Sequence, residues 1–119
     1  MQIQRQQTSK RMSQMVTYQG TVYLSGQVAE SGQGNIEQQT RETLEEIEKL
    51  LLEAGSDLKS ILSVTIYLQD IKRDFSGMNA VWDNWLPEGY APARATVEAL
   101  LCDESYLVEM SVVAALLDQ

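Results

Sequence analysis

Apolar side chains recur at helical spacing in the first half of the chain, between Asn35 and Gly55. Asn35 is a residue type that favours the start of a helix, with Gln38 three positions on, and Gly55 is typical of the position after a last turn. The spacing predicts a long amphipathic helix with one buried stripe. The stripe consists of Ile36, Leu44, Ile47, Leu50, Leu51 and Ala54.

A second helix is predicted over Phe75 to Leu86, because aromatic and aliphatic residues again recur every three or four positions. Pro87 and Gly89 follow this segment, and both residue types are typical of a helix end. The buried positions of this helix are expected to be Phe75, Met78, Val81, Trp82 and Trp85.

Short runs of β-branched and alternating apolar residues predict five strands. They are expected at residues 15–18, 21–25, 61–68, 94–100 and 106–116. Gln19 and Gly20 are predicted to join the first two strands as a tight turn, and residues 28–34 are predicted to form a loop.

The order β-β-α-β-α-β-β predicts a single α+β domain over residues 1–119, with two helices on one face of the sheet. Alternation along the strand 61–68 places its apolar residues, Leu62, Val64, Ile66 and Leu68, on the covered face. The opposite face is expected to be too polar to form a core and rather too apolar to remain exposed to solvent. It would carry Ser63, Thr65, Tyr67, Arg94, Thr96, Glu98, Glu109, Ser111 and Val113. Such a face usually packs against another subunit, so we expect a homo-oligomer with polar clefts between chains.

Charge and hydropathy exclude several classes of partner. Nine Lys plus Arg against seventeen Asp plus Glu give a formal charge of −8, and nucleic acid normally requires a basic surface. No apolar run approaches the roughly 20 residues needed to cross a bilayer, and the polar first residues lack the apolar segment of a signal peptide. We therefore expect a cytoplasmic protein that binds neither nucleic acid nor membrane.

The chain has no histidine and one cysteine, Cys102. These counts exclude an intrachain disulfide, a metal site of the usual thiolate and imidazole kind, and any Ser-His or Cys-His pair. Chemistry would have to use carboxylates, Arg, Lys, Tyr, backbone groups and water. No metal and no cofactor are expected.

Arg94 is the most informative charged residue, because it lies among small residues in a stretch, 91–99, that reads as a buried strand. A buried guanidinium needs a partner, since it cannot lose its charge. The partner is either Glu109 on the next predicted strand, in an ion pair that could simply hold the oligomer together, or the carboxylate of a ligand.

Four separated motifs resemble, in the same order, the RidA/YjgF family of reactive intermediate (enamine/imine) deaminases. They are Tyr23 to Gln27, Met78 to Trp82, Pro92 to Ala99 and Val108 to Met110. The resemblance extends roughly from Arg11 to the C-terminus. It implies a chorismate-mutase-like (bacillus-type) α+β fold and a trimer closed around a central sheet barrel, with three active sites at the subunit interfaces.

The resemblance also implies residue roles. Arg94 matches the family arginine that binds the substrate carboxylate through two parallel hydrogen bonds, and Glu109 matches the acidic residue that holds the attacking water. Gly26 and Thr96 match positions whose backbone groups line the pocket, and Ser25 supplies a nearby hydroxyl.

Asn79, from the helical motif, and Met12 complete the expected substrate-binding set. Met12 marks a departure from the family, whose typical members carry Gly-Pro-Tyr-Ser-Gln where this chain has residues 10–14, Lys-Arg-Met-Ser-Gln. Because Met12 replaces the tyrosine that lies over the site, the chain resembles a divergent subgroup, and the usual substrate preference does not carry over.

The expected activity is hydrolysis of a 2-enamine or 2-imine, similar to 2-aminoacrylate, to a 2-keto acid and ammonia. Such imines hydrolyse spontaneously, so holding a water and neutralising a carboxylate are sufficient for a useful acceleration. One alternative is a noncatalytic trimer that binds small keto acids, favoured by the missing tyrosine. Another is an endoribonuclease or translation inhibitor, which the charge of −8 argues against.

Overall fold

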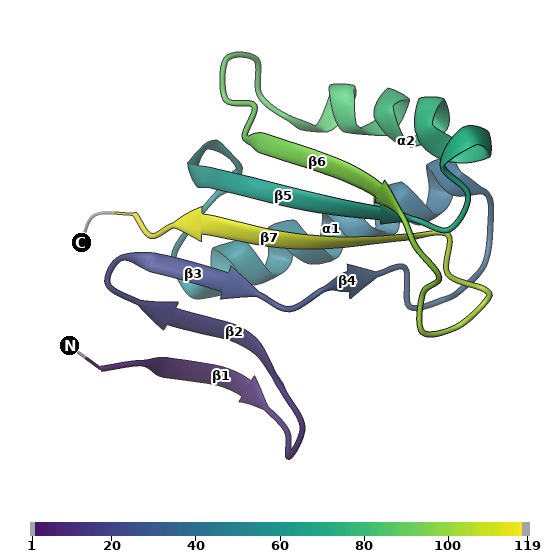
Figure 1. The fold of residues 1–119 in the computed structure, drawn as a ribbon. Helices are drawn as coiled ribbons and strands as arrows, with labels where there is room; N and C mark the ends of the chain where they lie inside the picture. The colour runs from purple at the N-terminus through teal and green to yellow at the C-terminus, as the bar shows by residue number, and fades with distance from the viewer. Residues whose placement is uncertain (1, 118–119) are drawn as a thin grey trace.

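A mixed β-sheet runs through the molecule, and both helices lie on one of its faces (Figure 1). The computed structural model describes residues 2–117, so residues 1, 118 and 119 of the predicted domain lie outside the described part. The strands are β1 (Gln4–Thr8), β2 (Ser13–Tyr18), β3 (Thr21–Leu24), β4 (Gln27–Val28), β5 (Ile61–Leu68), β6 (Ala93–Glu98) and β7 (Val108–Ala115). The helices are α1 (Ile36–Ala54) and α2 (Ile71–Trp85), with a 3₁₀ turn at Leu58–Ser60. The strand order is β1-β2-β3-β7-β5-β6, and β4 pairs with β7 next to β3.

Helix α1 begins and ends where the sequence predicts. The side chain of Asn35 accepts a hydrogen bond from the backbone N–H of Gln38 at 3.0 Å. Gly55 adopts a left-handed conformation with φ of 92°, and its N–H points to the last carbonyls, those of Leu51 and Leu52. A side chain would be strained at that φ, which explains the glycine.

The core lies between the helices and alternate residues of β5 and β7. Its strand residues include Val64, Ile66, Leu68, Val108, Met110, Val112 and Ala114, all buried. Full burial of one such aliphatic side chain is worth about 1.5–3 kcal/mol, so this set fixes which face turns inward. The residues between them, Ser63, Thr65, Tyr67, Glu109, Ser111 and Val113, are half-buried on the face that no helix covers, as predicted.

Two strands were not predicted. β1 is an antiparallel partner of β2, but its five residues are polar and exposed, so it carries no apolar alternation to detect. β4 overlaps the predicted 28–34 loop only at Val28, which pairs with Glu109 of β7. Both strands are specified by their neighbours' backbone groups and not by their own apolar side chains.

Helix α2 begins four residues earlier than predicted, at Ile71. The side chain of Asp70 caps it by accepting from the N–H of Arg73 at 3.0 Å, a signal that the apolar spacing alone did not reveal. Phe75 was predicted in the buried stripe but is 41% exposed. The helix lies toward the outer part of the sheet, where less of the molecule covers its flank.

Leu62 was predicted on the covered face of β5, and this prediction is wrong. The pairing of β5 with β7 shifts register between Ile61 and Ser63. Because the irregularity places one extra residue in β5, Ile61 is 5% exposed and Leu62 is 51% exposed.

The predicted face of β6 is also wrong. β6 runs parallel to β5, and paired residues of neighbouring strands point to the same face of a sheet. Arg94, Thr96 and Glu98 pair with the buried residues Val64, Ile66 and Leu68, so they lie on the helix side. β6 is an edge strand with little cover on either face, so polarity does not reveal which of its residues turn toward the helices.

Within residues 2–117, neither helix combines the length and the apolar composition that crossing a membrane requires.

Candidate functional site

Glu109 lies on the uncovered face of the sheet, paired with Tyr67 of β5 and Val28 of β4. Its carboxylate lies against the backbone at Gly26, between β3 and β4. A Cβ at Gly26 would overlap a carboxylate oxygen of Glu109 and come within 2.9 Å of its Cδ. Glycine at this position therefore lets the Glu109 carboxylate contact the main chain. The carboxylate occupies the space that any larger side chain at position 26 would need.

A small amide and hydroxyl network fixes the chain on both sides of Gly26. The hydroxyl of Ser25 donates to Oε1 of Gln14 at 2.7 Å. The Nε2 of Gln27, which is buried, donates to the same oxygen at 2.9 Å and to the Ser25 carbonyl at 3.1 Å. Sequence reasoning placed Ser25 and Gly26 in the site but missed Gln14 and Gln27, although both lie within the motifs compared with the family.

Met12 lies at the turn between β1 and β2, two residues before Gln14. Its carbonyl accepts a hydrogen bond from the N–H of Ser9 at 2.8 Å, and its side chain is exposed. The structure therefore places Met12 at the end of the hairpin that leads into the Gln14 network.

We refer to Ser25, Gly26 and Glu109 together as the glutamate side of the candidate site.

Arg94, Thr96 and Asn79 form the other half of the candidate site, which we call the arginine side. The guanidinium carbon of Arg94 lies over the ring of Trp82, 5.1 Å from its centroid. Among residues 2–117, the Arg94 side chain makes no hydrogen bond or ion pair, and it is exposed. The expectation of a buried guanidinium is therefore wrong for the single chain, because β6 lies open at the sheet edge.

Thr96 is half-buried beside Ile66 on the same face as Arg94. Asn79 is half-buried on α2, three residues before Trp82, so the two share one flank of the helix. This flank is the one whose Trp82 ring contacts Arg94.

The two sides of the candidate site do not meet in one chain. Arg94 is on the helix side of β6, whereas Glu109 is on the opposite face of β7, and β5 separates the two strands. The ion pair between them that the sequence left open is absent among the described residues. Each chain therefore offers a cation and an anion that no counter-charge of the described chain neutralises.

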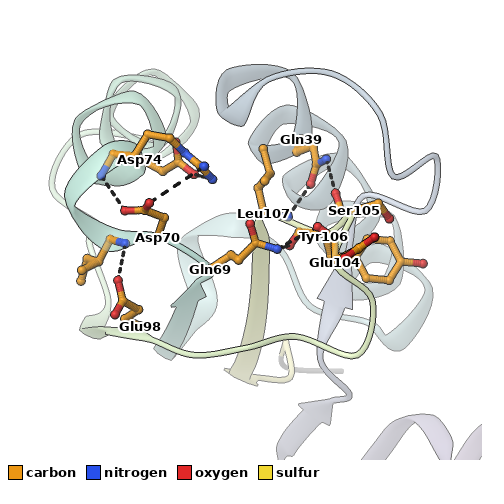
Figure 2. Close-up of polar contacts among 11 residues, drawn as sticks. Gln39, Gln69, Asp70, Asp74, Glu98, Glu104, Ser105, Tyr106 and Leu107 are labelled. Carbon is orange, nitrogen blue, oxygen red and sulfur yellow. Dashed lines mark hydrogen bonds and ion pairs between the residues drawn. The ribbon is translucent and has the colours of Figure 1, made fainter.

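The segment between β6 and β7 is fastened by side-chain amides (Figure 2). The amide of Gln39 on α1 donates to the Ser105 carbonyl and accepts from the Leu107 N–H, both at 2.9 Å. Gln69 donates to the Glu104 carbonyl at 2.8 Å. These contacts fix the start of β7, on which Glu109 is the second residue.

At the other end of this segment, the Glu98 carboxylate accepts from the N–H of Ile71 at 3.0 Å, which ties the end of β6 to the first turn of α2 (Figure 2). Sequence reasoning missed Gln39, Gln69 and Glu98. The only signal for Gln39 in the sequence was its position within the helix, near the buried stripe.

The side chains of Asp103 and Arg73 have shifted pKa values. The backbone N–H and the hydroxyl of Ser105 donate to Asp103 at 2.8 and 2.7 Å and hold the pKa of its carboxyl below the usual value. The pKa of Arg73 is raised by its hydrogen bond and ion pair with Asp74. Both groups support loops and helix ends and belong to neither side of the candidate site.

A groove of about 450 Å³ lies between α1 and α2, lined by residues that include Arg41, Leu44 and Trp85. None of the predicted site residues lines it. Among residues 2–117, no group of three or more His, Cys, Asp or Glu side chains could hold a metal ion. The groove therefore adds no residue to the candidate site, which consists of the glutamate side and the arginine side.

The mixed sheet with both helices on one face defines a small α+β protein of a known architecture. The chain belongs to the Endoribonuclease L-PSP family, also called the YjgF/RidA/RutC family, whose model matches residues 2–116. The family resemblance carried by the four motifs is thereby confirmed.

The similarity to individual proteins extends over almost the whole chain. It is 42% identical to the RutC family protein YoaB of Escherichia coli K12, over 97% of this chain and 99% of that protein. A crystal structure of an uncharacterized protein from Pseudomonas aeruginosa matches with a TM-score of 0.94 and 46% identity, covering 98% of this chain and 100% of that one. The crystal structure of NMB1025 from Neisseria meningitidis, a member of the YjgF protein family, matches with a TM-score of 0.95 and 39% identity, covering 100% and 98%.

Proposed function

We propose that this protein hydrolyses reactive 2-enamines or 2-imines to 2-keto acids and ammonia, at a site that joins the arginine side of one copy to the glutamate side of another. The observation that carries the proposal is the position of Arg94 and Glu109 on opposite faces of one sheet, each without a counter-charge among residues 2–117. A substrate with a carboxylate and an adjacent imine needs a cation at one end and a water-binding base at the other.

In the proposed reaction, the planar guanidinium of Arg94 binds the substrate carboxylate through two parallel hydrogen bonds. Glu109 holds a water molecule and accepts its proton as the oxygen adds to the imine carbon. Return of that proton to the nitrogen gives the neutral carbinolamine. The hydroxyl proton is then transferred to nitrogen as the C–N bond breaks, which releases ammonia and forms the carbonyl of the 2-keto acid. Backbone groups at Gly26 and Thr96, together with the side chains of Ser25, Asn79 and Met12, would shape the rest of the site.

The proposed assembly is a homotrimer. The uncovered sheet face carries partly buried residues such as Thr65, Ser111 and Val113 and the exposed Tyr23, and β6 is open along its whole length. A second copy would cover these surfaces and bring the two sides together. Analytical ultracentrifugation should give three times the chain mass of 13.4 kDa. A stable monomer at micromolar concentration would contradict the assembly and the shared site.

Mixing two inactive variants tests whether the site is shared between copies. Arg94→Met and Glu109→Gln should each lose activity, since each lacks one required group. If the two variants are unfolded, mixed in equal amounts and refolded, random trimers should regain about a quarter of the wild-type activity, because one interface in four then has both native groups. Each variant refolded alone is the control.

Activity can be measured by competition with semicarbazide for imine that an amino-acid oxidase generates in place. No recovery on mixing would place both groups of each site in one chain and contradict the shared site. If the wild type bound 2-keto acids but never lowered the semicarbazone yield, the protein would be a keto-acid-binding trimer. The family's endoribonuclease name is tested by RNA binding at several salt concentrations, which the charge of −8 predicts to be weak throughout.

A further inference from the structure

Trp82 is the aromatic side chain against which the Arg94 guanidinium lies. Its ring centroid is 5.1 Å from the guanidinium carbon, and the arginine has no hydrogen bond or ion pair within residues 2–117. Trp82 itself is 6% exposed and belongs to the core. It also packs against Trp85, with ring centroids 5.6 Å apart. A fixed ring therefore contacts a cation that is otherwise free to move.

We propose that Trp82 is a positioning residue, which holds the Arg94 guanidinium through its ring face and leaves the guanidinium N–H groups available for a 2-keto or 2-imino acid carboxylate. This inference rests on the proposed function. The attraction between a cation and an aromatic face needs no hydrogen-bond donor of the arginine. It also restricts a long side chain before the substrate arrives, so less rotamer freedom is lost on binding.

Trp85 provides a matched comparison on the same helix. It is the second tryptophan of the chain, it packs in the same aromatic pair, and it lines the groove toward α1. The cation contact, however, is made by Trp82. If Trp82 only filled the core, replacing either tryptophan would disturb the site to a similar extent.

Calorimetry with pyruvate as the probe distinguishes positioning of Arg94 by Trp82 from simple filling of the core. We expect Trp82→Leu to weaken pyruvate binding about five-fold, the scale of one exposed cation–π contact, and Trp82→Phe to restore affinity to within about two-fold. Trp85→Leu should leave the affinity unchanged. Equal losses in Trp82→Leu and Trp85→Leu, or no rescue by the phenylalanine ring, would overturn the positioning role.

Fluorescence gives a readout that keeps Trp82 in place and so holds even if Trp82→Leu fails to fold. In a Trp85→Phe background, Trp82 is the only tryptophan. Arg94→Met should then change its emission, while Arg73→Met, the control, should not. Pyruvate should change the emission only when Arg94 is present.

The outcomes distinguish this inference from the function on which it rests. If the wild type does not bind pyruvate or related keto acids, the proposed function fails and the positioning role fails with it. If the wild type binds them but Trp82 emission is unchanged by Arg94→Met, the positioning role alone is overturned.

Discussion

The glutamate side and the arginine side differ in how firmly a single chain holds them. On the glutamate side, Gln14, Ser25 and Gln27 fix the backbone around Gly26, and the Gly26 backbone leaves room for the Glu109 carboxylate. On the arginine side, Arg94 lies on an exposed edge strand. One half of the site is thus organised within the chain, whereas the other depends on an aromatic contact and on whatever binds there.

This difference suggests a division of roles. A residue that activates water must be held in one geometry, because general base catalysis depends on distance and direction. A residue that binds a carboxylate gains its energy from the ligand itself, so a partial restraint before the ligand arrives, such as the contact of Arg94 with Trp82, is sufficient. The contrast between the two sides therefore supports assigning the chemistry to Glu109 and the binding to Arg94.

The largest expected effect is that of Glu109→Gln on catalysis. The amide keeps the shape of the side chain but cannot accept the proton of water, so imine hydrolysis should slow by about 10² or more. Binding of 2-keto acids should change little, because Arg94 supplies the counter-charge. Semicarbazide competition measures the first quantity and calorimetry the second. Glu104→Gln, in the exposed loop before β7, is the control and should behave as wild type. Equal competition by Glu109→Gln and wild type would remove Glu109 from the mechanism.

Arg94→Lys should show the opposite pattern, with a smaller effect that falls on binding. Lysine keeps the charge but loses the two parallel hydrogen bonds, so 2-keto acid affinity should fall by about 1.5–3 kcal/mol. The free energy of unfolding should not change, because Arg94 is exposed and makes no hydrogen bond within the described chain.

Arg73→Lys is the matched control for this experiment. Arg73 donates twice to the buried Asp74 carboxylate, at 3.1 and 2.9 Å, so its replacement should affect stability and not ligand affinity. If Arg94→Lys destabilised the fold and left affinity unchanged, Arg94 would be a structural residue.

The sequence predicted those elements in which burial of one face determines the spacing of apolar residues. Helix α1 was located with both its caps, and the alternation on β5 and β7 identified the core face, because each of these elements has one dry side. Glu109 was placed on the correct face for the same reason. Leu62 was misplaced because a local register shift cannot be read from alternation.

The spacing of apolar residues did not predict the orientation of the arginine side. β6 is exposed on both faces, so polarity carries no information about its orientation, and Arg94 was assigned to the wrong face. The roles of Gln14 and Gln39 depend on partners 11 or more residues away, and no local pattern specifies such pairs. Arg94 and Glu109 were singled out from the strand patterns, and the other residues of the site were named from family resemblance. Their division between two faces required the structure.

Gln39→Ala should reveal the framework that holds the glutamate side, with an effect on stability. Gln39 is 1% exposed and satisfies a carbonyl of Ser105 and an N–H of Leu107. Leaving these groups without partners should lower the free energy of unfolding by about 1–3 kcal/mol. Urea denaturation at matched protein concentration measures it. Gln38→Ala, at the neighbouring exposed position, should stay within about 0.5 kcal/mol of wild type, and an equal loss in both variants would contradict this role of Gln39.

The smallest expected effect is that of Glu98→Gln, which tests whether the end of β6 is tied to α2 independently of the site. Glu98 accepts from the first N–H of α2, and a carboxylate at a helix N-terminus is worth about 0.3–1 kcal/mol when exposed. Glutamine keeps an acceptor but loses the charge, so the loss of stability should lie near the lower end and disappear at high salt, where such interactions are screened. Affinity for 2-keto acids should remain at the wild-type value, although Glu98 is only four residues from Arg94 on the same face. A salt-independent loss of stability would remove the helix-terminus interaction as its cause. A fall in affinity as large as that of Arg94→Lys would mean that the anchoring of β6, and not the Trp82 ring alone, sets the position of the guanidinium.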